Sequence, residues 1–203
     1  MSIGEDGPSQ MGLEDISLFG TVPDCVVLQP CDAVSTAQLV PEMITHDGFA
    51  YMRTLRPKTS LLYKNEDMFS IGGSKVLRQS DNDVLTVSAS GITVFEALKA
   101  ADELQQENIS IRVVDCYSIH PVDVDTLKKC LNETKQKVII TVEDHFEHGG
   151  LGDFVAAALS DDQGQVIKMA VQKISQSGTM DELLNDAGID AGHIIARVRD
   201  ILK

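Results

Sequence analysis

Short apolar runs alternate with amphipathic helical segments along most of this chain, and this alternation restricts its fold more than any other feature. The strongest run is residues 138–142, Val-Ile-Ile-Thr-Val, and residues 84–88 form a second one. Neither run alternates with polar residues, which is typical of strands buried on both faces of a parallel sheet. Residues 93–106 place apolar side chains on one side of a helix. Strands and helices in this order predict an α/β fold.

The first section of the chain contains too few strands for a complete domain. Apolar runs at residues 25–28 and 49–52 flank a helix predicted from residue 33 to 44, with Asp32 as its cap. This order predicts a βαβ unit. Two strands do not form an independently stable sheet, so residues 1–56 are predicted to be an incomplete parallel-sheet segment, the late part of a larger domain.

A linker and a complete small domain are predicted to follow. Residues 57–74 show no alternation of apolar runs and amphipathic helical segments. Pro57, Gly72 and Gly73 are typical of a linker that crosses a surface. Residues 75–203 are predicted to be a complete small α/β domain. Its further strands are expected at residues 84–88, 109–114, 138–142 and 166–171, and its helices at 93–106, 123–132, 151–159, 180–187 and 191–202.

The charge balance excludes several classes of partner. The 203 residues carry 17 basic and 31 acidic side chains, for a net charge of −14. Such a surface repels phosphate backbones and anionic lipids, so neither a nucleic acid nor a membrane is the expected partner. A small phosphorylated ligand needs only one local positive pocket. The acidic first residues do not resemble a secretory signal, and the four cysteines show no CxxC pairing, so buried, reduced thiols in a cytoplasmic protein are expected.

Two arginines follow the strand predicted at residues 49–52. Arg53 and Arg56 are the only basic side chains among the first 56 residues, which hold eight acidic ones. Ligands of parallel α/β sheets bind beyond the carboxyl ends of the strands, and a guanidinium there can grip a phosphate or carboxylate with two hydrogen bonds. The alternative is that both arginines neutralise nearby carboxylates.

The turn formed by residues 6–10, Asp-Gly-Pro-Ser-Gln, is a second candidate site. Glycine and proline favour a tight turn from which short polar side chains point into a cleft. Asp6 can accept hydrogen bonds from sugar-like hydroxyls, and Gln10 can donate or accept them. The alternative is an ordinary turn before a helix.

Residues 143–150, EDHFEHGG, resemble a metal cluster only at first sight. His145 and His148 follow a strand in an HxxH spacing without a cysteine partner, whereas zinc needs three or four converging ligands. The segment is interpreted as a polar surface turn that leads into the Gly149-Gly150 bend. No metal site is predicted.

Several segments together resemble the transketolase family. The N-terminal segment SIGEDGPSQMGLEDISLF is similar to the late part of the family's pyrimidine-binding domain. The family's later segments follow in the same order, namely VLQPCDAVSTAQ, FAYMRTLRP, SASGITVFEALKAADEL, IRVVDCYSIHPVD and ITVEDHFEHGGLGD. GEDGPSQ and RTLRP are the most specific of them, and they argue against a weaker resemblance to the beta subunit of two-oxoacid dehydrogenases.

The resemblance implies a function and site residues. Transketolases use thiamine diphosphate and a divalent cation, Mg²⁺ or Ca²⁺, to move a two-carbon ketol unit from a ketose phosphate to an aldose phosphate. It implies that Asp6 hydrogen-bonds a substrate hydroxyl, that Arg56 binds the sugar phosphate and that Gln10 lies near the cofactor. Arg53 is expected to be structural.

The resemblance also implies what this chain lacks. The family's diphosphate and metal domain and the earlier half of its pyrimidine-binding domain are not matched, so the chain alone is expected to bind no cofactor and to be inactive. It would then work in a homodimer or with the remainder of a transketolase, or serve as a non-catalytic interaction module. The chain departs from the family pattern in four residues, which indicate a divergent copy: Gly20, Leu55, Cys116 and Gln176.

Overall fold

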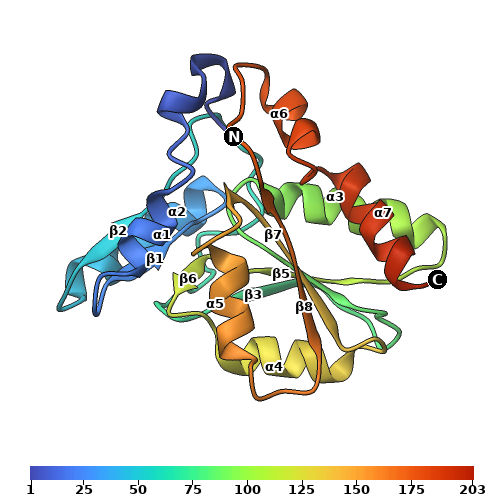
Figure 1. Cartoon of the computed structure of the whole chain (residues 1–203). Helices are drawn as coiled ribbons and strands as arrows, with labels where there is room; N and C mark the ends of the chain where they lie inside the picture. The colour runs from blue at the N-terminus through green and yellow to red at the C-terminus, as the bar shows by residue number, and fades with distance from the viewer.

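The computed structural model describes residues 1–203 and contains two β-sheets with helices packed on their faces (Figure 1). The smaller sheet has the order β2-β1-β6 and the larger one the order β3-β5-β4-β7-β8. The strands are β1 (Val26–Leu28), β2 (Ala50–Met52), β3 (Lys75–Arg78), β4 (Thr86–Ala89), β5 (Arg112–Asp115), β6 (Ser118–His120), β7 (Val138–Phe146) and β8 (Gln165–Val171). The helices are η1 (Gly4–Asp6), η2 (Pro8–Gln10), α1 (Asp15–Gly20), α2 (Ala33–Thr45), α3 (Thr93–Gln106), α4 (Val124–Glu133), α5 (Leu151–Ala158), α6 (Met180–Asp186) and α7 (Ala191–Ile201).

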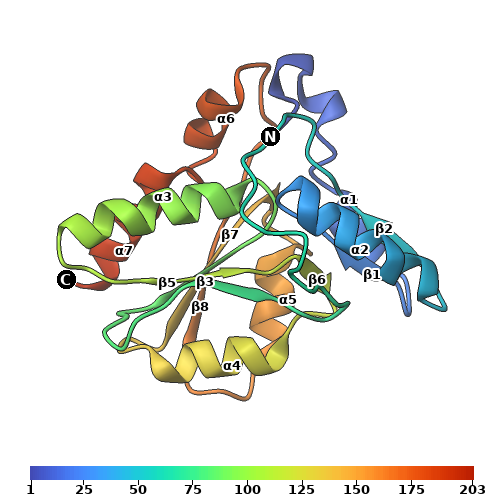
Figure 2. The ribbon, with the colours of Figure 1, turned by 180° about the vertical axis from the view of Figure 1, so that it is seen from behind.

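The larger sheet confirms the predicted α/β fold. Strands β5, β4, β7 and β8 are parallel, and β3 is an antiparallel edge strand. Neighbouring residues of β7 enter different cores: Ile140 belongs to the cluster that includes α3 and α7, and Ile139 belongs to the cluster that includes α4 and α5. Figure 2 shows these two helix pairs on opposite faces of the sheet. Both faces are covered, which is why the strand residues need no polar alternation.

The smaller sheet contains the predicted βαβ unit. Strands β1 and β2 pair in parallel, with Leu28 opposite Met52. The carboxylate of Asp32 accepts a hydrogen bond of 2.8 Å from the Ser35 amide and caps α2, as expected. The third strand, β6, was not predicted. It comes from the second section of the chain, pairs antiparallel with β1 and joins the two sections of the fold.

Residues 57–74 contain no helix or strand, yet part of the segment is buried. Tyr63 and Phe69 pack edge to face with ring centroids 4.8 Å apart, and Phe69 packs in the same way on Tyr117 at 5.0 Å. The expectation of a segment that only crosses the surface was therefore incomplete, because two isolated aromatic residues leave no periodic pattern in a sequence. The four cysteines are free and buried, and none of the helices is both long and apolar enough to cross a bilayer.

Candidate functional site

Asp6 and Arg56 meet in one open cavity of about 590 Å³. The Arg56 guanidinium donates a hydrogen bond to the Asp6 carboxylate through Nη1, and the two groups form an ion pair. Asp6 is 46% exposed and Arg56 is 62% exposed, so both remain accessible to a ligand. The residues that line the cavity are Ser2, Glu5, Asp6, Arg56, Pro57, Thr179, Met180 and Asp181. The sequence gives no signal for Thr179, Met180 and Asp181, because they approach Asp6 only through the tertiary fold.

The turn that carries Asp6 is seated on the C-terminal part of the chain. The Gly178 amide donates a hydrogen bond of 3.1 Å to the Gly4 carbonyl. A Cβ atom at Gly4 would lie 2.5 Å from the Gly178 carbonyl oxygen, so only glycine permits this approach of η1 to the segment before α6. Asp6 therefore takes its position from α6 as well as from its own turn.

Arg53 fixes the segment that carries Arg56. It is 9% exposed, and its Nη2 donates a hydrogen bond of 2.9 Å to the Asp144 carbonyl. Its Nε lies 3.4 Å from the Asp15 carboxylate, and its Nη2 lies 3.6 Å from the Asp144 carboxylate. Asp144 and Asp15 thus hold the chain just after β2, three residues before Arg56.

Asp144 is the buried acceptor at which several segments converge. Its side chain accepts hydrogen bonds of 3.0 Å from Gln29 and of 2.8 Å from the Met1 amino group. Burial by itself raises the pKa of Asp144, but the charges of Arg53 and of that amino group, with the Gln29 hydrogen bond, hold its pKa at about 2. The carboxylate is therefore ionised, and its charge is compensated inside the protein.

The interpretation of residues 143–150 as a polar surface turn was wrong for its first part. Strand β7 continues to Phe146, and Glu143, Asp144 and His145 are buried. Glu143 accepts amide hydrogen bonds of 2.6 Å from Leu151 and 2.8 Å from Gly152 at the start of α5, while burial raises its pKa to about 8. Polar residues in a sequence normally indicate exposure. Burial of these polar side chains is tolerable only because the tertiary fold places hydrogen-bond donors beside them.

His145 fills a similar structural role at the end of the same strand. Its Nε2 accepts a hydrogen bond of 3.2 Å from the Ser17 amide, and its Nδ1 lies 2.7 Å from the Phe146 carbonyl, so Nδ1 carries the proton. Burial lowers the pKa of His145, which keeps the ring neutral. No three His, Cys, Asp or Glu side chains converge as metal ligands would.

The charges in the cavity determine what it can bind. Glu5, Asp6 and Asp181 contribute carboxylates, and Arg56 contributes the one guanidinium. Arg56 can donate two hydrogen bonds to a phosphate, and Asp6 can accept hydrogen bonds from hydroxyl groups. A phosphate has to compete with Asp6 for Arg56, but an exposed ion pair of this kind contributes only about 0–1 kcal/mol, so the competition is weak.

Gln10 does not line this cavity. It is exposed at the end of η2, and its side-chain amide makes no hydrogen bond within the chain. The fold therefore brings Asp6 and Arg56 together and leaves Gln10 on the neighbouring surface.

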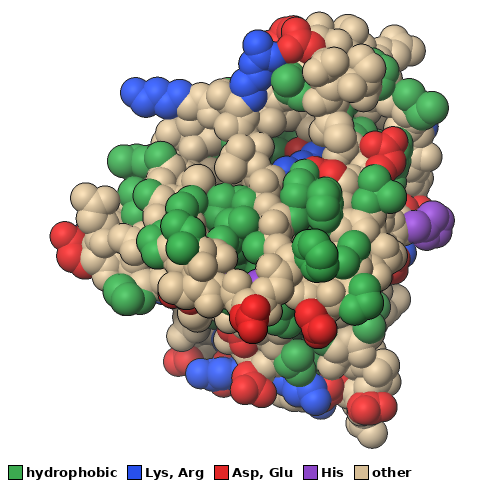
Figure 3. Space-filling view, turned by 90° about the vertical axis from the view of Figure 1, so that its left-hand side faces the viewer, with side chains coloured by type: hydrophobic (Ala, Val, Ile, Leu, Met, Phe, Trp, Pro, Cys, Tyr) green, Lys and Arg blue, Asp and Glu red, His purple; other side chains and the backbone are tan.

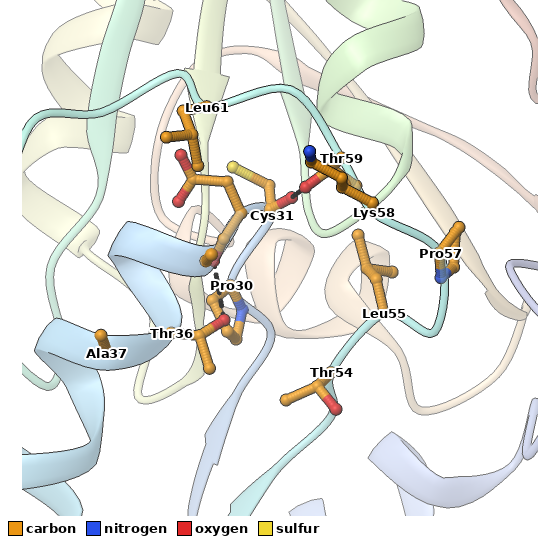
Figure 4. Close-up of a pocket in the computed structure, with 12 residues that line it drawn as sticks. Pro30, Cys31, Thr36, Ala37, Thr54, Leu55, Pro57, Lys58, Thr59 and Leu61 are labelled. Atoms are coloured by element: carbon orange, nitrogen blue, oxygen red, sulfur yellow. Dashed lines mark hydrogen bonds between the residues drawn. The ribbon is translucent and has the colours of Figure 1, made fainter.

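A second cavity of about 530 Å³ lies beyond the carboxyl ends of β1 and β2 (Figure 4). Thr36 and Ala37 come from α2, and Leu55 and Leu61 come from the segment after β2. Pro57 lines both cavities, so a single short segment separates them.

Cys31, which lines the second cavity, belongs to a buried polar cluster beneath it. One oxygen of Asp115 accepts hydrogen bonds of 2.6 Å from the Tyr63 hydroxyl and 3.3 Å from the Cys31 thiol. The other oxygen has no partner. Burial raises the pKa of Asp115 to about 7, although the Tyr63 and Cys31 hydrogen bonds oppose this rise and nearby Asp32 adds to it. Burial and Asp115 also raise the pKa of Cys31, so this thiol is not activated.

We expect Asp115 to make the stability of the chain depend on pH. An acid whose pKa is raised on folding binds more protons in the native state, so the free energy of unfolding should fall as the pH rises from about 4 to about 7. In Asp115→Asn this decline should be shallower, whereas exposed Asp125→Asn on α4 should retain it. Urea unfolding at pH 5, 6, 7 and 8 measures the slopes. Equal slopes in all three proteins would contradict the assignment.

Two family models cover nearly the whole chain. The model of the transketolase C-terminal domain matches residues 73–194, more than half of the chain, and the model of the transketolase pyrimidine binding domain matches residues 1–60. The chain belongs to the transketolase family. The fold expected from the resemblance is thereby confirmed.

Relatives of this transketolase-family chain agree with that assignment. It is 47% identical over 203 residues to transketolase-like protein 1 of Macaca fascicularis, covering 100% of this chain and 34% of the relative. It is 40% identical over 203 residues to transketolase of Rattus norvegicus, covering 100% of this chain and 32% of the relative. The chain therefore spans about a third of the length of these relatives.

Solved structures have the same fold. A chain described as "Split gene transketolase, inactive beta4 tetramer" superimposes with a TM-score of 0.86 at 31% identity, over 96% of this chain and 62% of that chain. Transketolase from Campylobacter jejuni superimposes with a TM-score of 0.71 at 18% identity, over 98% of this chain and 30% of that chain, which shows the fold alone.

Proposed function

We propose that this chain is the C-terminal portion of a thiamine-diphosphate-dependent transketolase of the cytoplasm. The complete enzyme would transfer a two-carbon ketol unit from a ketose phosphate to an aldose phosphate in the pentose phosphate pathway. Family membership and relatives named transketolase support this function. The chain covers about a third of those relatives, so we expect it to be inactive by itself.

The observation that carries the proposal is the convergence of Asp6 and Arg56. They come from segments fifty residues apart and share one accessible cavity. We propose that Arg56 holds the phosphate of the sugar and that Asp6 accepts a hydrogen bond from a sugar hydroxyl. A phosphate bound at a distance from the reacting carbon contributes binding energy that orients the sugar. The reacting carbon is then already positioned for the chemical step.

The matched family regions are the C-terminal and pyrimidine binding domains, and about two-thirds of the length of the relatives lies outside this chain. We propose that thiamine diphosphate and its Mg²⁺ or Ca²⁺ are held by transketolase segments outside this chain. Gln10 is exposed near Asp6, and its side-chain amide would contact the cofactor. The proposed domain limits are 1–56 for the pyrimidine-binding segment, 57–74 for the linker and 75–203 for the C-terminal domain.

A non-catalytic association module is the second candidate function. The observation that favours it is that the solved split-gene relative is described as an inactive tetramer of one kind of chain. In this case the chain would use its folded C-terminal domain to associate with other chains, including longer transketolases, without turnover.

The test of the proposed function is reconstitution. The 203-residue chain should be co-expressed with the part of rat transketolase that precedes the region matched by this chain, and ketol transfer should be measured with thiamine diphosphate and Mg²⁺. We expect no activity from either part alone and measurable transfer from the co-purified pair. A co-purified pair that binds sugar phosphate but shows no turnover would contradict the catalytic function and favour the association module.

A further inference from the structure

The α6 side of the Asp6–Arg56 cavity offers one free polar group, the carboxylate of Asp181. Thr179 also lines the cavity, but its hydroxyl donates a hydrogen bond of 2.9 Å to the Glu182 carboxylate, which accepts another of 3.0 Å from the Thr179 amide. These bonds form the capping box of α6 and engage both side chains. Asp181 lies between the two in sequence and is exposed, and its carboxylate forms no ion pair or hydrogen bond within the chain.

The nearby cations do not neutralise Asp181. Its charge reaches Lys99 of α3, but the Lys99 ammonium donates a hydrogen bond of 2.6 Å to Glu96, and this bond raises the pKa of Lys99 more than Asp181 does. Lys58 lines the second cavity. On the side of the molecule that carries the N-terminal section, basic side chains are few and apolar ones cover the middle (Figure 3). The cavity itself has Arg56 as its one basic side chain.

The side chains that line the cavity therefore have a negative balance of charge. Arg56 contributes one positive charge, and Glu5, Asp6 and Asp181 contribute three negative ones, which gives a net charge of −2 (1 minus 3). A phosphate monoester carries about −1.5 to −2 near neutral pH. Arg56 attracts such a group, whereas the unpaired carboxylates of Glu5 and Asp181 repel it across the water of the cavity. A second phosphate would meet carboxylates and no further guanidinium among these residues.

We propose that Asp181 is a specificity-determining residue of the sugar-phosphate site. Together with Glu5 it weakens the binding of phosphate, so that the site accepts sugars with one phosphate group and rejects those with two. The inference rests on the proposed function and deepens it by naming the charge class of the substrate. It also gives α6 a part in substrate selection, whereas Asp6 and Arg56 belong to the N-terminal section.

Repulsion of this kind depends on the charge of the ligand and hardly on its shape. Its effect should therefore grow with the number of phosphate groups, vanish for an uncharged sugar and weaken as salt screens the charges. A carboxylate that instead accepts a hydrogen bond from a sugar hydroxyl would favour binding of charged and uncharged sugars alike. The two roles thus predict changes of opposite sign when the charge is removed.

The experiment uses the co-expressed pair described above with Asp181→Asn, which removes the charge and keeps the size of the side chain. The cap of α6 is retained, because it uses Thr179 and Glu182. Asp125→Asn is the matched control, since Asp125 is likewise an exposed aspartate in the first turn of a helix, α4, but lies outside the cavity. Glu5→Gln is a second variant on the opposite wall. Circular dichroism confirms that each variant is folded.

Kinetics give KM for fructose 6-phosphate and for erythrulose, an uncharged ketose donor. Titration calorimetry gives Kd for fructose 1,6-bisphosphate without turnover. In Asp181→Asn and in Glu5→Gln we expect KM for fructose 6-phosphate to fall about two- to fivefold, with KM for erythrulose unchanged. The Kd of the bisphosphate should fall about four- to 25-fold, because twice the charge squares the factor. Raising the ionic strength from about 0.01 M to about 0.15 M shortens the Debye length from about 30 Å to about 8 Å and should reduce both differences.

Asp125→Asn should change none of these values, and an equal fall there would make the net charge of the chain the cause and overturn the inference. A higher or unchanged KM for fructose 6-phosphate in Asp181→Asn, with ketol transfer by the wild-type pair, would overturn the inference and leave the proposed function standing. A pair without turnover whose Kd responds as expected would overturn the catalytic function alone. Neither turnover nor binding of the bisphosphate by the wild-type pair or by Asp181→Asn would overturn both.

Discussion

Asp144→Ala is expected to lower the free energy of unfolding by about 3–5 kcal/mol, because it leaves the buried Arg53 guanidinium without its main counter-charge. For a chain of this size, the loss corresponds to a fall in Tm of about 6–20 °C. Urea and thermal unfolding followed by circular dichroism measure both quantities. Asp186→Ala on α6 is the matched control, since its ion pair with Lys173 is exposed and its loss should cost about 1 kcal/mol or less.

The same variant tests the state of the Asp144 carboxylate. Its pKa is lowered on folding to about 2, so its contribution to stability is present above about pH 4 and is lost as the pH falls through 2. The difference between wild type and Asp144→Ala should therefore be largest near neutral pH and should shrink toward pH 2. The double variant Arg53→Met/Asp144→Leu should recover part of the lost free energy of unfolding. A loss below about 1 kcal/mol for Asp144→Ala would show that this network does not hold the two sections together.

In the reconstituted enzyme, Arg56→Ala is expected to raise KM for a ketose phosphate or an aldose phosphate about 10- to 100-fold. The estimate follows from a charge-assisted hydrogen bond worth about 1.5–3 kcal/mol, at about 1.4 kcal/mol for each factor of ten. The KM for an unphosphorylated ketol donor should change little, because the lost contact is made to phosphate. Steady-state kinetics with both kinds of donor measure the difference.

Arg78→Ala provides the control for this prediction. Arg78 is also an exposed arginine in an ion pair, with Asp102, but it lies on β3 outside the Asp6–Arg56 cavity. Its removal should leave both KM values unchanged. An equal rise in KM for phosphorylated and unphosphorylated donors in Arg56→Ala would show that Arg56 does not bind the phosphate.

The regular parts of the fold were predictable because their signals are local. The helix predicted at residues 93–106 coincides with α3, the run at 138–142 lies within β7, and the run at 84–88 overlaps β4. Strand β6 was missed because its three residues gain their pairing only from β1, about ninety residues earlier. The burial of Asp144 was missed for the same reason, since its donors Met1 and Gln29 lie 143 and 115 residues earlier in the chain.

The candidate site was predictable in part. Asp6 and Arg56 were selected from a turn motif, a strand end and a family resemblance, and they do share a cavity. The contribution of Thr179, Met180 and Asp181 depends on how η1 docks against α6, for which the local sequence holds no signal.

The docking of Gly4 on Leu183 and Gly178 has a mechanical consequence. Asp6 is anchored to α6 of the C-terminal part, whereas Arg56 follows a strand of the smaller sheet. The two residues therefore take their positions from different elements of the fold. A shift of η1 and α6 relative to the smaller sheet would change the distance between the two side chains without altering either of them.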